Sequence, residues 1–241
     1  MPEGPTIVVF KKKLEKFSGK TVTESGGYNN PYQDQISGKK LISLGTFGKY
    51  LLLDFGDSLI TVHFGLYGSF LINEQKKVNP SFSLFFDEDY VNFYVVKIKK
   101  IADKNVFNEK LNVFSEQYDV AATEKLLLGK KFLTQKVGDV LMNQDIFPGV
   151  GNIIRNEVLF MSDLHPESIV GKIPREKIRE LLQNIRKFSL ASVPLIEGKI
   201  WKSSAAVYQK QLYKGDEVTE YVSQKIKRKT FVNEKTQKLY R

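Results

Sequence analysis

The chain contains 241 residues, of which 41% are hydrophobic and 27% charged, a composition typical of a folded globular protein rather than a disordered or fibrous one. It has no cysteine and only two histidines, His63 and His165, which excludes disulfides, thiolate zinc sites and cysteine nucleophiles and predicts neither a metal nor another cofactor. Lys and Arg number 37 against 27 Asp and Glu, and this net charge of +10 favours a polyanionic partner, although excess lysine can also serve solubility alone.

The first predicted element is an amphipathic helix between Pro5 and Gly19. Its apolar residues recur at helical spacing: Ile7, Phe10, Leu14 and Phe17. From Lys40 to Val96 the pattern changes to short runs of β-branched, aromatic and leucine residues, separated by turns that contain glycine or polar residues. Many short strands at this spacing are typical of a β-sandwich or barrel.

After about residue 119 the apolar periodicity becomes helical again. Helices are expected near residues 120–128, 137–145, 151–162 and 174–192. At the C-terminus, Ser223–Val232 and Gln237–Tyr240 flank the turn-forming residues 233–236, which predicts a β-hairpin. The expected fold class is α+β, with an N-terminal domain of residues 1–115 and a helical domain of residues 116–241 that ends in the hairpin segment, about 205–241.

Three separate motifs occur along this chain. They are Met1–Pro5 (MPEGP), Gly48–Leu53 (GKYLLL) at the start of a strand, and Gly149–Ile153 (GVGNI) leading into a helix. In order and spacing they resemble the formamidopyrimidine-DNA glycosylase and endonuclease VIII family of base-excision repair enzymes, from residue 1 to about 210. The resemblance implies an N-terminal β-sandwich, a helical domain with a helix–two-turn–helix element, and a DNA groove between them.

The resemblance also implies that the N-terminal residues are catalytic. Removal of Met1 would expose the secondary amine of Pro2, and a pKa near ~8 leaves a neutral fraction that can attack the sugar. Glu3 would protonate the sugar ring oxygen, which requires a partly desolvated carboxyl group, although a glutamate before the first helix would also favour that helix's dipole. Thr6 stands where the family usually has a second glutamate, and it cannot titrate, so weaker activity or an altered substrate range is expected.

By the same resemblance, Lys49 contacts a phosphate beside the lesion, and Asn152 helps to clamp another. The glycines before Asn152 let backbone N–H groups approach an anion at the amino end of a helix. Two structural alternatives stay open. A lysine at a strand edge can simply prevent edge pairing, and an asparagine at this position can serve as the helix N-cap.

The loop His63–Gly68 carries the adjacent apolar residues Leu66 and Tyr67, which are suited to fill the gap left by an everted base. This pair is more similar to the endonuclease VIII branch than to the formamidopyrimidine branch. The segment 93–102 also lacks the Arg-Arg-Phe-Gly run by which the latter branch reads an orphaned cytosine. Three lysines are present instead: Lys97, Lys99 and Lys100. These features favour oxidised pyrimidines over 8-oxoguanine.

The C-terminal segment departs most from the family. Residues 199–241 contain 11 Lys or Arg and 4 Asp or Glu, which places +7 of the net +10 here. In much of the family this segment is a four-cysteine zinc ribbon whose hairpin arginine reaches the DNA, so a hairpin without cysteine must be zincless. Aligned by spacing, Lys235 is expected to take the place of that arginine, and an apolar contact involving Tyr221 and Tyr240 is expected to replace part of the metal's cross-link. The alternative is a basic, partly disordered arm.

Taken together, these features predict a monomeric, bifunctional DNA glycosylase and abasic-site lyase that acts through a Pro2 Schiff base. Its expected partner is double-stranded DNA containing oxidised bases or abasic sites. Two alternatives are a non-catalytic damaged-DNA-binding protein derived from this family and a general nucleic-acid-binding module. No secretory signal and no apolar run of ~20 residues is present, so an intracellular location, cytoplasm or nucleoid, without membrane contact is expected.

Overall fold

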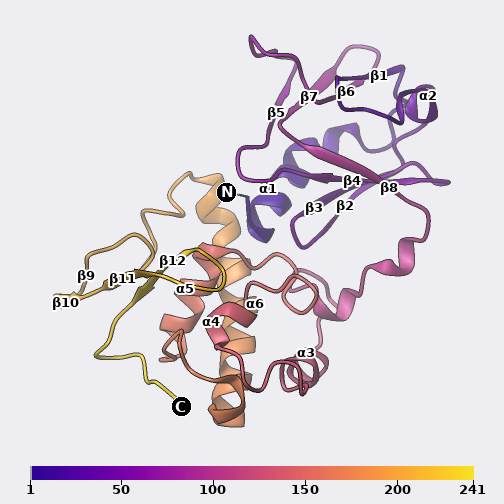
Figure 1. Cartoon of the computed structure of the whole chain (residues 1–241). Helices are drawn as coiled ribbons and strands as arrows, with labels where there is room; N and C mark the ends of the chain where they lie inside the picture. The colour runs from indigo at the N-terminus through magenta and orange to yellow at the C-terminus, as the bar shows by residue number, and fades with distance from the viewer. Residues whose placement is uncertain (1) are drawn as a thin grey trace. The chain divides into compact units, whose positions relative to one another are not determined.

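A computed structural model describes residues 2–241 of the chain (Figure 1). It divides into two compact units, of which the first contains Pro2 and Thr6–Phe107, and the second contains Glu3–Pro5 and Asn108–Arg241. The division after Phe107 lies upstream of the 115–116 boundary expected from the sequence. Residues just past it already pack with the helices, since Val113 belongs to the buried core of the second unit.

The first unit is a β-sandwich with a helix at its start, as the sequence predicts. The helical elements are α1 (Gly4–Leu14), the 3-10 turn η1 (Glu15–Phe17), α2 (Gln33–Ile36) and the 3-10 turn η2 (Lys104–Val106). One antiparallel sheet has the order β1-β6-β7-β5, with β1 (Glu24–Gly26), β6 (Phe82–Phe85), β7 (Tyr90–Tyr94) and β5 (Ser69–Ile72). The other has the order β2-β3-β4-β8, with β2 (Ser43–Phe47), β3 (Tyr50–Asp54), β4 (Leu59–His63) and β8 (Lys97–Ile101).

Alternation along the strands decides which side chains form this core. In β3, Leu51 and Leu53 are buried, whereas Tyr50 lies on the outer face because successive side chains of a strand point to opposite faces. Apolar residues of both sheets join one cluster, to which α1 and η1 contribute Ile7, Leu14 and Phe17. The expected helical spacing of the first element is therefore confirmed as its core-facing stripe.

The second unit is mostly helical up to Glu197. Its elements are η3 (Glu109–Leu111), α3 (Val120–Leu127), α4 (Val137–Val140), α5 (Asn152–Met161), η4 (Val170–Lys172) and α6 (Arg175–Glu197). The four helices confirm the predicted positions, but α4 is shorter than expected because turns follow it up to Gly149, whose φ is +93°. Figure 1 shows α5 and α6 packed side by side, and both contribute to the same buried cluster.

Residues 205–241, called the finger below, form two short antiparallel ladders. The strands are β9 (Leu212–Tyr213), β10 (Asp216–Glu217), β11 (Thr219–Val222) and β12 (Lys229–Val232). In the hairpin, Thr219 pairs with Val232 and Val222 with Lys229, so its turn spans residues 223–228. A β-hairpin without cysteine is present as predicted, but the predicted pairing of 223–232 with 237–240 is wrong.

The last residues leave the hairpin and run along another part of the second unit. Lys238 forms a parallel bridge with Leu164, accepts a hydrogen bond from the His165 N–H at 2.9 Å and donates one to the Asp163 carbonyl at 2.8 Å. The backbone N–H and C=O groups of Lys238, which were predicted to pair within the hairpin, therefore bond with residues 163 and 165 instead. Within the described residues, no helix is long and apolar enough to cross a bilayer.

Candidate active site

The predicted nucleophile, Pro2, stands at the beginning of the described chain. It is half-buried and directly precedes Glu3, whose side chain is almost completely buried. Thr6 lies in the first turn of α1 and is also half-buried. Met1, whose removal would free the Pro2 amine, lies outside the described residues. The role of the Pro2 amine as the nucleophile therefore stays a prediction.

The carboxylate of Glu3 is held by the amino end of α5. Its two oxygens accept hydrogen bonds from the backbone N–H groups of Ile153 and Ile154, at 2.8 and 3.1 Å. These N–H groups have no partner within the helix, and the helix dipole favours a negative charge beside them. Gly151 makes this approach possible, because a Cβ atom at that position would lie 2.2 Å from the Glu3 Cδ. Glu3 therefore stabilises α5 rather than the first helix.

This arrangement corrects the expectation that the amino end of α5 offers its backbone N–H groups to a phosphate. Glu3 occupies two of them. Asn152 is 7% exposed, and its side-chain amide donates a hydrogen bond to the Lys229 carbonyl at 2.9 Å. Because Lys229 begins β12, Asn152 connects α5 to the finger, and its contact with DNA stays a prediction.

Arg155 makes the second connection between α5 and the finger. Its guanidinium donates to the Lys229 carbonyl at 3.0 Å and to the Thr230 hydroxyl at 2.9 Å, although the side chain is only 1% exposed. The Asn156 side-chain carbonyl accepts a hydrogen bond from the Phe231 N–H at 2.8 Å. Three polar side chains of α5, those of Asn152, Arg155 and Asn156, thus fix the first three residues of β12.

Glu157 completes the attachment of the finger at its other end. This buried carboxylate accepts hydrogen bonds of 2.7–2.9 Å from the backbone N–H groups of residues 206–208, where the chain enters the finger. Hydrogen bonds to a charged acceptor are stronger than neutral ones. One helix therefore holds Glu3 at its amino end and the finger along its side.

The electrostatics place Glu3, Arg155 and Tyr208 in one cluster. Burial lowers the pKa of the Arg155 guanidinium to about 10, and the charge of Glu3 acts in the opposite direction. Burial, followed by the Glu3 carboxylate, raises the pKa of the Tyr208 hydroxyl. At neutral pH, Arg155 is therefore charged and the Tyr208 hydroxyl is neutral.

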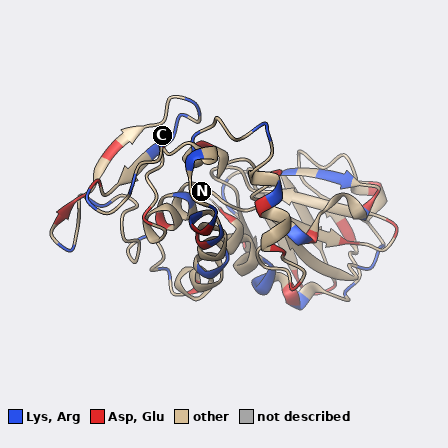
Figure 2. Ribbon diagram, turned by 90° about the horizontal axis from the view of Figure 1, so that it is seen from below, with Lys and Arg blue, Asp and Glu red and all other residues tan. Residues whose placement is uncertain are grey.

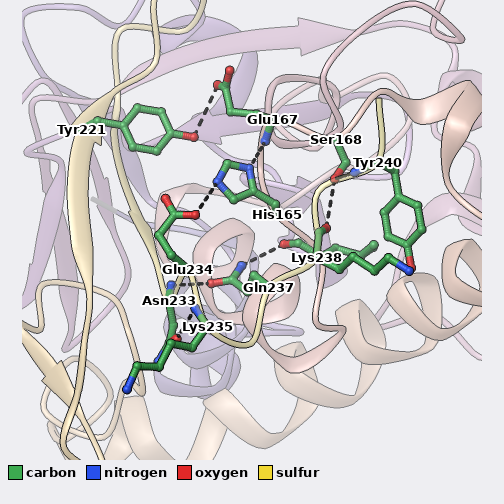
Figure 3. Close-up of polar contacts among 11 residues, drawn as sticks. His165, Glu167, Ser168, Tyr221, Asn233, Glu234, Lys235, Gln237, Lys238 and Tyr240 are labelled. Carbon is green, nitrogen blue, oxygen red and sulfur yellow. Dashed lines mark hydrogen bonds and ion pairs between the residues drawn. The ribbon is translucent and has the colours of Figure 1, made fainter.

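A polar network closes the far end of the finger (Figure 3). The side-chain carbonyl of Gln237 accepts from the Asn233 N–H at 2.9 Å, and its amide donates to the Leu164 carbonyl at 2.8 Å. His165 Nδ1 accepts from the Glu167 N–H at 3.0 Å, and its Nε2 lies 3.4 Å from the Glu234 carboxylate. These contacts join residues 233–238 to the helical part of the unit.

These residues do not fit a zinc site. The chain has no thiolate to offer, and Gln237 and His165 already use their polar atoms in hydrogen bonds. Among residues 2–241 there is no group of three or more His, Cys, Asp or Glu that could hold a metal ion. Tyr221 takes part in the finger's attachment, since its hydroxyl donates to Glu167 at 3.3 Å. The Tyr240 N–H donates to the Ser168 hydroxyl at 3.1 Å.

Lys235 does not lie in the turn of the hairpin. It follows β12, and its ammonium pairs with the Asp216 carboxylate, which raises its pKa. The turn between β11 and β12 instead contains the exposed Lys225, Lys227 and Arg228. Arg228 is thus an exposed arginine in the hairpin turn that the sequence analysis did not select, and contact of Lys235 with DNA stays a prediction.

Lys49 occupies the tip of the turn between β2 and β3. Phe47 pairs with Tyr50 across this turn, and Gly48 has a φ of +56°, a conformation that favours glycine. Lys49 is half-buried, and its charge reaches His63 on β4. Burial lowers the pKa of His63, and the positive charges of Lys49 and Lys97 lower it further. This end of the sheet therefore has a positive potential.

Leu66 and Tyr67 are exposed, as expected of residues that would insert into DNA. They are 45% and 80% exposed, in a tight loop after β4. The loop is closed by a 2.7 Å hydrogen bond from the Gly68 N–H to the Phe64 carbonyl. Because Phe64 is buried in the sandwich core, the loop has a firm base, and the insertion role stays a prediction.

Two residues that sequence analysis missed left recognisable signals. Arg155 lies between the apolar pairs Ile153–Ile154 and Val158–Leu159 of a predicted helix, where a charged residue that faces the core needs buried partners. Arg228 belongs to the basic run Lys225–Lys229 between two segments with strand-forming residues. The sequence predicts the turn at residues 233–236 because their composition is more typical of a turn, and it assigns the basic run to a strand instead.

Two family models match the chain and together cover most of it. Residues 1–103 match the formamidopyrimidine-DNA glycosylase N-terminal domain, and residues 111–201 match the formamidopyrimidine-DNA glycosylase H2TH domain. Among curated relatives, endonuclease 8-like 3 from Bos taurus is 36% identical over 155 residues, which is 60% of this chain and 25% of that protein. The chain thus spans about a quarter of the length of this relative.

A bacterial relative is matched over more of its length, and solved structures share the fold. Formamidopyrimidine-DNA glycosylase from Carboxydothermus hydrogenoformans is 28% identical over 200 residues, covering 78% of this chain and 75% of that protein. The Lactococcus lactis formamidopyrimidine-DNA glycosylase bound to DNA with an abasic site superposes with a TM-score of 0.85 at 19% identity, covering 98% of this chain and 99% of that one. A viral DNA glycosylase superposes with a TM-score of 0.80 at 17% identity, covering 98% of this chain and 100% of that one.

Proposed function

Because the chain belongs to the formamidopyrimidine-DNA glycosylase and endonuclease VIII family, we propose that it is a bifunctional DNA glycosylase and abasic-site lyase. Its substrate is double-stranded DNA with an oxidised base or an abasic site, and it works inside the cell. The observation that supports this proposal best is the placement of Glu3. A buried carboxylate, fixed by two N–H groups and adjacent to Pro2, is suited to proton transfer beside an N-terminal amine.

The proposed reaction begins with attack of the neutral Pro2 amine on C1′ of the damaged nucleotide. The bond from C1′ to the base breaks, and the base leaves with the bonding electrons and takes up a proton from water. The Glu3 carboxylate takes the proton that the Pro2 amine loses and delivers it to the ring oxygen, so the sugar opens to an iminium ion between Pro2 and C1′. Loss of a proton from C2′ then expels the 3′ phosphate by elimination, and water releases the sugar from Pro2.

Two cationic residues are proposed to hold the DNA backbone in this reaction. Lys49 stands at the tip of the β2–β3 turn, and Arg228 stands in the hairpin turn of the finger. Arg228 replaces Lys235 in this role, since Lys235 is paired with Asp216. An arginine also offers the planar, bidentate geometry that suits phosphate.

Borohydride trapping tests the proposed nucleophile. The full chain with Met1 removed, verified by mass spectrometry, is incubated with an abasic duplex and sodium borohydride, and the covalent adduct is measured. We expect a strong adduct, and loss of most of it in Pro2→Gly and in protein that retains Met1, because neither presents the secondary amine. Equal trapping by Pro2→Gly would show that another group is the nucleophile.

A non-catalytic damaged-DNA-binding protein is the second candidate function. Thr6 motivates it, because the family's usual glutamate is absent at that position. The two functions separate in one experiment, since a binding protein would retain abasic DNA in a mobility-shift assay but form no adduct and cut no strand.

The proposed lesion preference is inferred from the segment by which the formamidopyrimidine branch reads the opposite base. The absence of an Arg-Arg-Phe-Gly run between residues 93 and 102 favours oxidised pyrimidines over 8-oxoguanine. Excision from matched duplexes that contain thymine glycol or 8-oxoguanine measures this preference. Faster release of 8-oxoguanine opposite cytosine would contradict it.

A further inference from the structure

A pocket of about 460 Å³ opens on the outer face of the sheet β2-β3-β4-β8, within the first unit. Its floor is formed by cross-strand neighbours, because Tyr50 pairs with His63, His63 with Lys97, and Thr61 with Lys99. Phe107 contributes one wall and packs against Phe47 with ring centroids 4.9 Å apart. The volume falls in the range that small-molecule pockets occupy.

The pocket combines positive charge with aromatic surface. Lys97 and Lys99 are exposed and line it together with His63, whereas none of the described residues lining it carries a carboxylate. Tyr50 is 39% exposed, and its ring centroid lies 5.2 Å from that of His63. An aromatic platform beside lysines is the usual composition of surfaces that bind single-stranded nucleic acids, where bases stack and phosphates meet cations.

Successive side chains of β8 point to opposite faces of the sheet, so Lys100 does not share a face with Lys97 and Lys99. Lys97 and Lys99 lie on the pocket face, whereas Lys100 lies on the other face, and its ammonium donates to the Gln35 side chain at 2.7 Å. Segment 93–102, where the formamidopyrimidine branch has its Arg-Arg-Phe-Gly run, contains three lysines. Two of them, Lys97 and Lys99, therefore line the same pocket. Neither the proposed nucleophile nor the finger uses them.

We propose that this pocket binds an unpaired nucleotide of a DNA strand, with the base stacked on Tyr50 and the flanking phosphates on Lys97 and Lys99. An unpaired base is required because the bases of a duplex are already stacked and cannot enter a pocket. This site rests on the proposed function only for the identity of its ligand, since that function makes DNA the polyanion that the protein meets. The site would hold a strand segment that has left the duplex.

Fluorescence anisotropy with an undamaged oligothymidylate and with a duplex of equal length tests the site in the full chain. Lys97→Ala/Lys99→Ala is expected to weaken single-strand binding at least tenfold and to lower the slope of log affinity against log salt by about 1.4, at ~0.7 per phosphate contact. Tyr50→Leu is expected to weaken it about tenfold without changing the slope, because stacking is lost and charge is kept. Thermal melting verifies that each variant is folded.

Lys100→Ala is the matched control, since it removes the same charge from the same strand on the opposite face. It should leave both affinity and slope near those of the unaltered protein. Equal losses in Lys100→Ala, or equal losses on duplex and single strand, would overturn the pocket in favour of general attraction. Failure of borohydride trapping by the unaltered protein would remove the proposed function and leave this binding result standing.

Discussion

Gly151 and Glu3 depend on one another at atomic scale. The backbone of Gly151 is extended, a conformation that any residue can adopt. A glycine is needed here because a larger residue would not fit beside Glu3. A side chain there would meet the Glu3 Cδ, Cγ and Oε1 at 2.2–2.4 Å, far inside van der Waals contact. The Glu3 carboxylate can therefore reach the two N–H groups only because residue 151 has no Cβ atom.

Gly151→Ala is expected to displace Glu3 and abolish base excision, while lowering the free energy of unfolding by about 1–3 kcal/mol through overpacking. Gly198→Ala is the matched control in the same unit, because its Cβ would meet no atom closer than 3.5 Å. Excision assays and urea denaturation measure both effects. A Gly151→Ala protein as active as the Gly198→Ala protein would show that the Glu3 geometry is not needed.

The lowered pKa of His63 makes the stability of the folded protein depend on pH. Burial and the charges of Lys49 and Lys97 lower its pKa in the folded protein, so the unfolded chain binds the proton more readily. The contribution of His63 to stability is therefore fully present above its ordinary pKa of 6.5 and is lost as the pH falls below it.

A bound phosphate would reverse the local charge and raise the pKa of His63, so oligonucleotide binding takes up a proton. We expect single-strand affinity to increase as the pH falls from 7.5 to 6, and this increase to disappear in His63→Gln. Anisotropy titrations at constant ionic strength measure it. An identical pH profile in His63→Gln would assign the effect to another group.

At the scale of elements, α5 organises the second unit. It binds Glu3 at its amino end and fixes β12 through three side chains, so the finger can be positioned without a metal. Arg155 is the most demanding of these residues because its charge is buried, and a buried charge is retained only when it is hydrogen-bonded.

Arg155→Met is expected to remove two hydrogen bonds to β12, those to the Lys229 carbonyl and the Thr230 hydroxyl, and to reduce stability by about 2 kcal/mol. Because the Arg155 guanidinium binds Lys229 and Thr230 of β12, limited proteolysis of this variant should cut first within the finger. Arg241→Met, at the exposed C-terminus, should behave like the unaltered protein. Excess EDTA should change neither the melting temperature nor activity. Uniform proteolysis of Arg155→Met, or a loss of stability in EDTA, would contradict this view of the finger.

Elements with a strong periodicity could be predicted from the sequence, and those fixed by long-range contacts could not. The helices and the sandwich strands follow local patterns of apolar residues, and they lie where expected. The hairpin register depended instead on partners far away in sequence, since Leu164 and His165 hold the segment around Lys238. In the same way, the partner of Glu3 lies 150 residues away, so only its need for a desolvated position could be predicted.

At the scale of the whole molecule, Lys and Arg residues are spread over both units, although residues 199–241 account for +7 of the net charge of +10. Figure 2 shows Lys and Arg on the sandwich, the helices and the finger, with acidic residues interspersed. Many of these lysines are paired, as Lys235 is with Asp216 and Lys104 with Asp54. The count of 37 Lys and Arg alone therefore overstates the number of cations that can release counterions from DNA.

Salt dependence separates the paired cations from those that contact DNA. Each phosphate contact on duplex DNA contributes ~0.9 to the slope of log affinity against log salt. Lys49→Ala and Arg228→Ala are each expected to lower the slope by about 0.9 on abasic duplex, because both residues stand at the tips of turns and are proposed to meet phosphates. Lys235→Ala removes the same charge from the same finger as Arg228→Ala but should leave the slope nearly unchanged, since Asp216 already balances it. A larger change for Lys235→Ala than for Arg228→Ala would restore Lys235 as the finger's DNA contact.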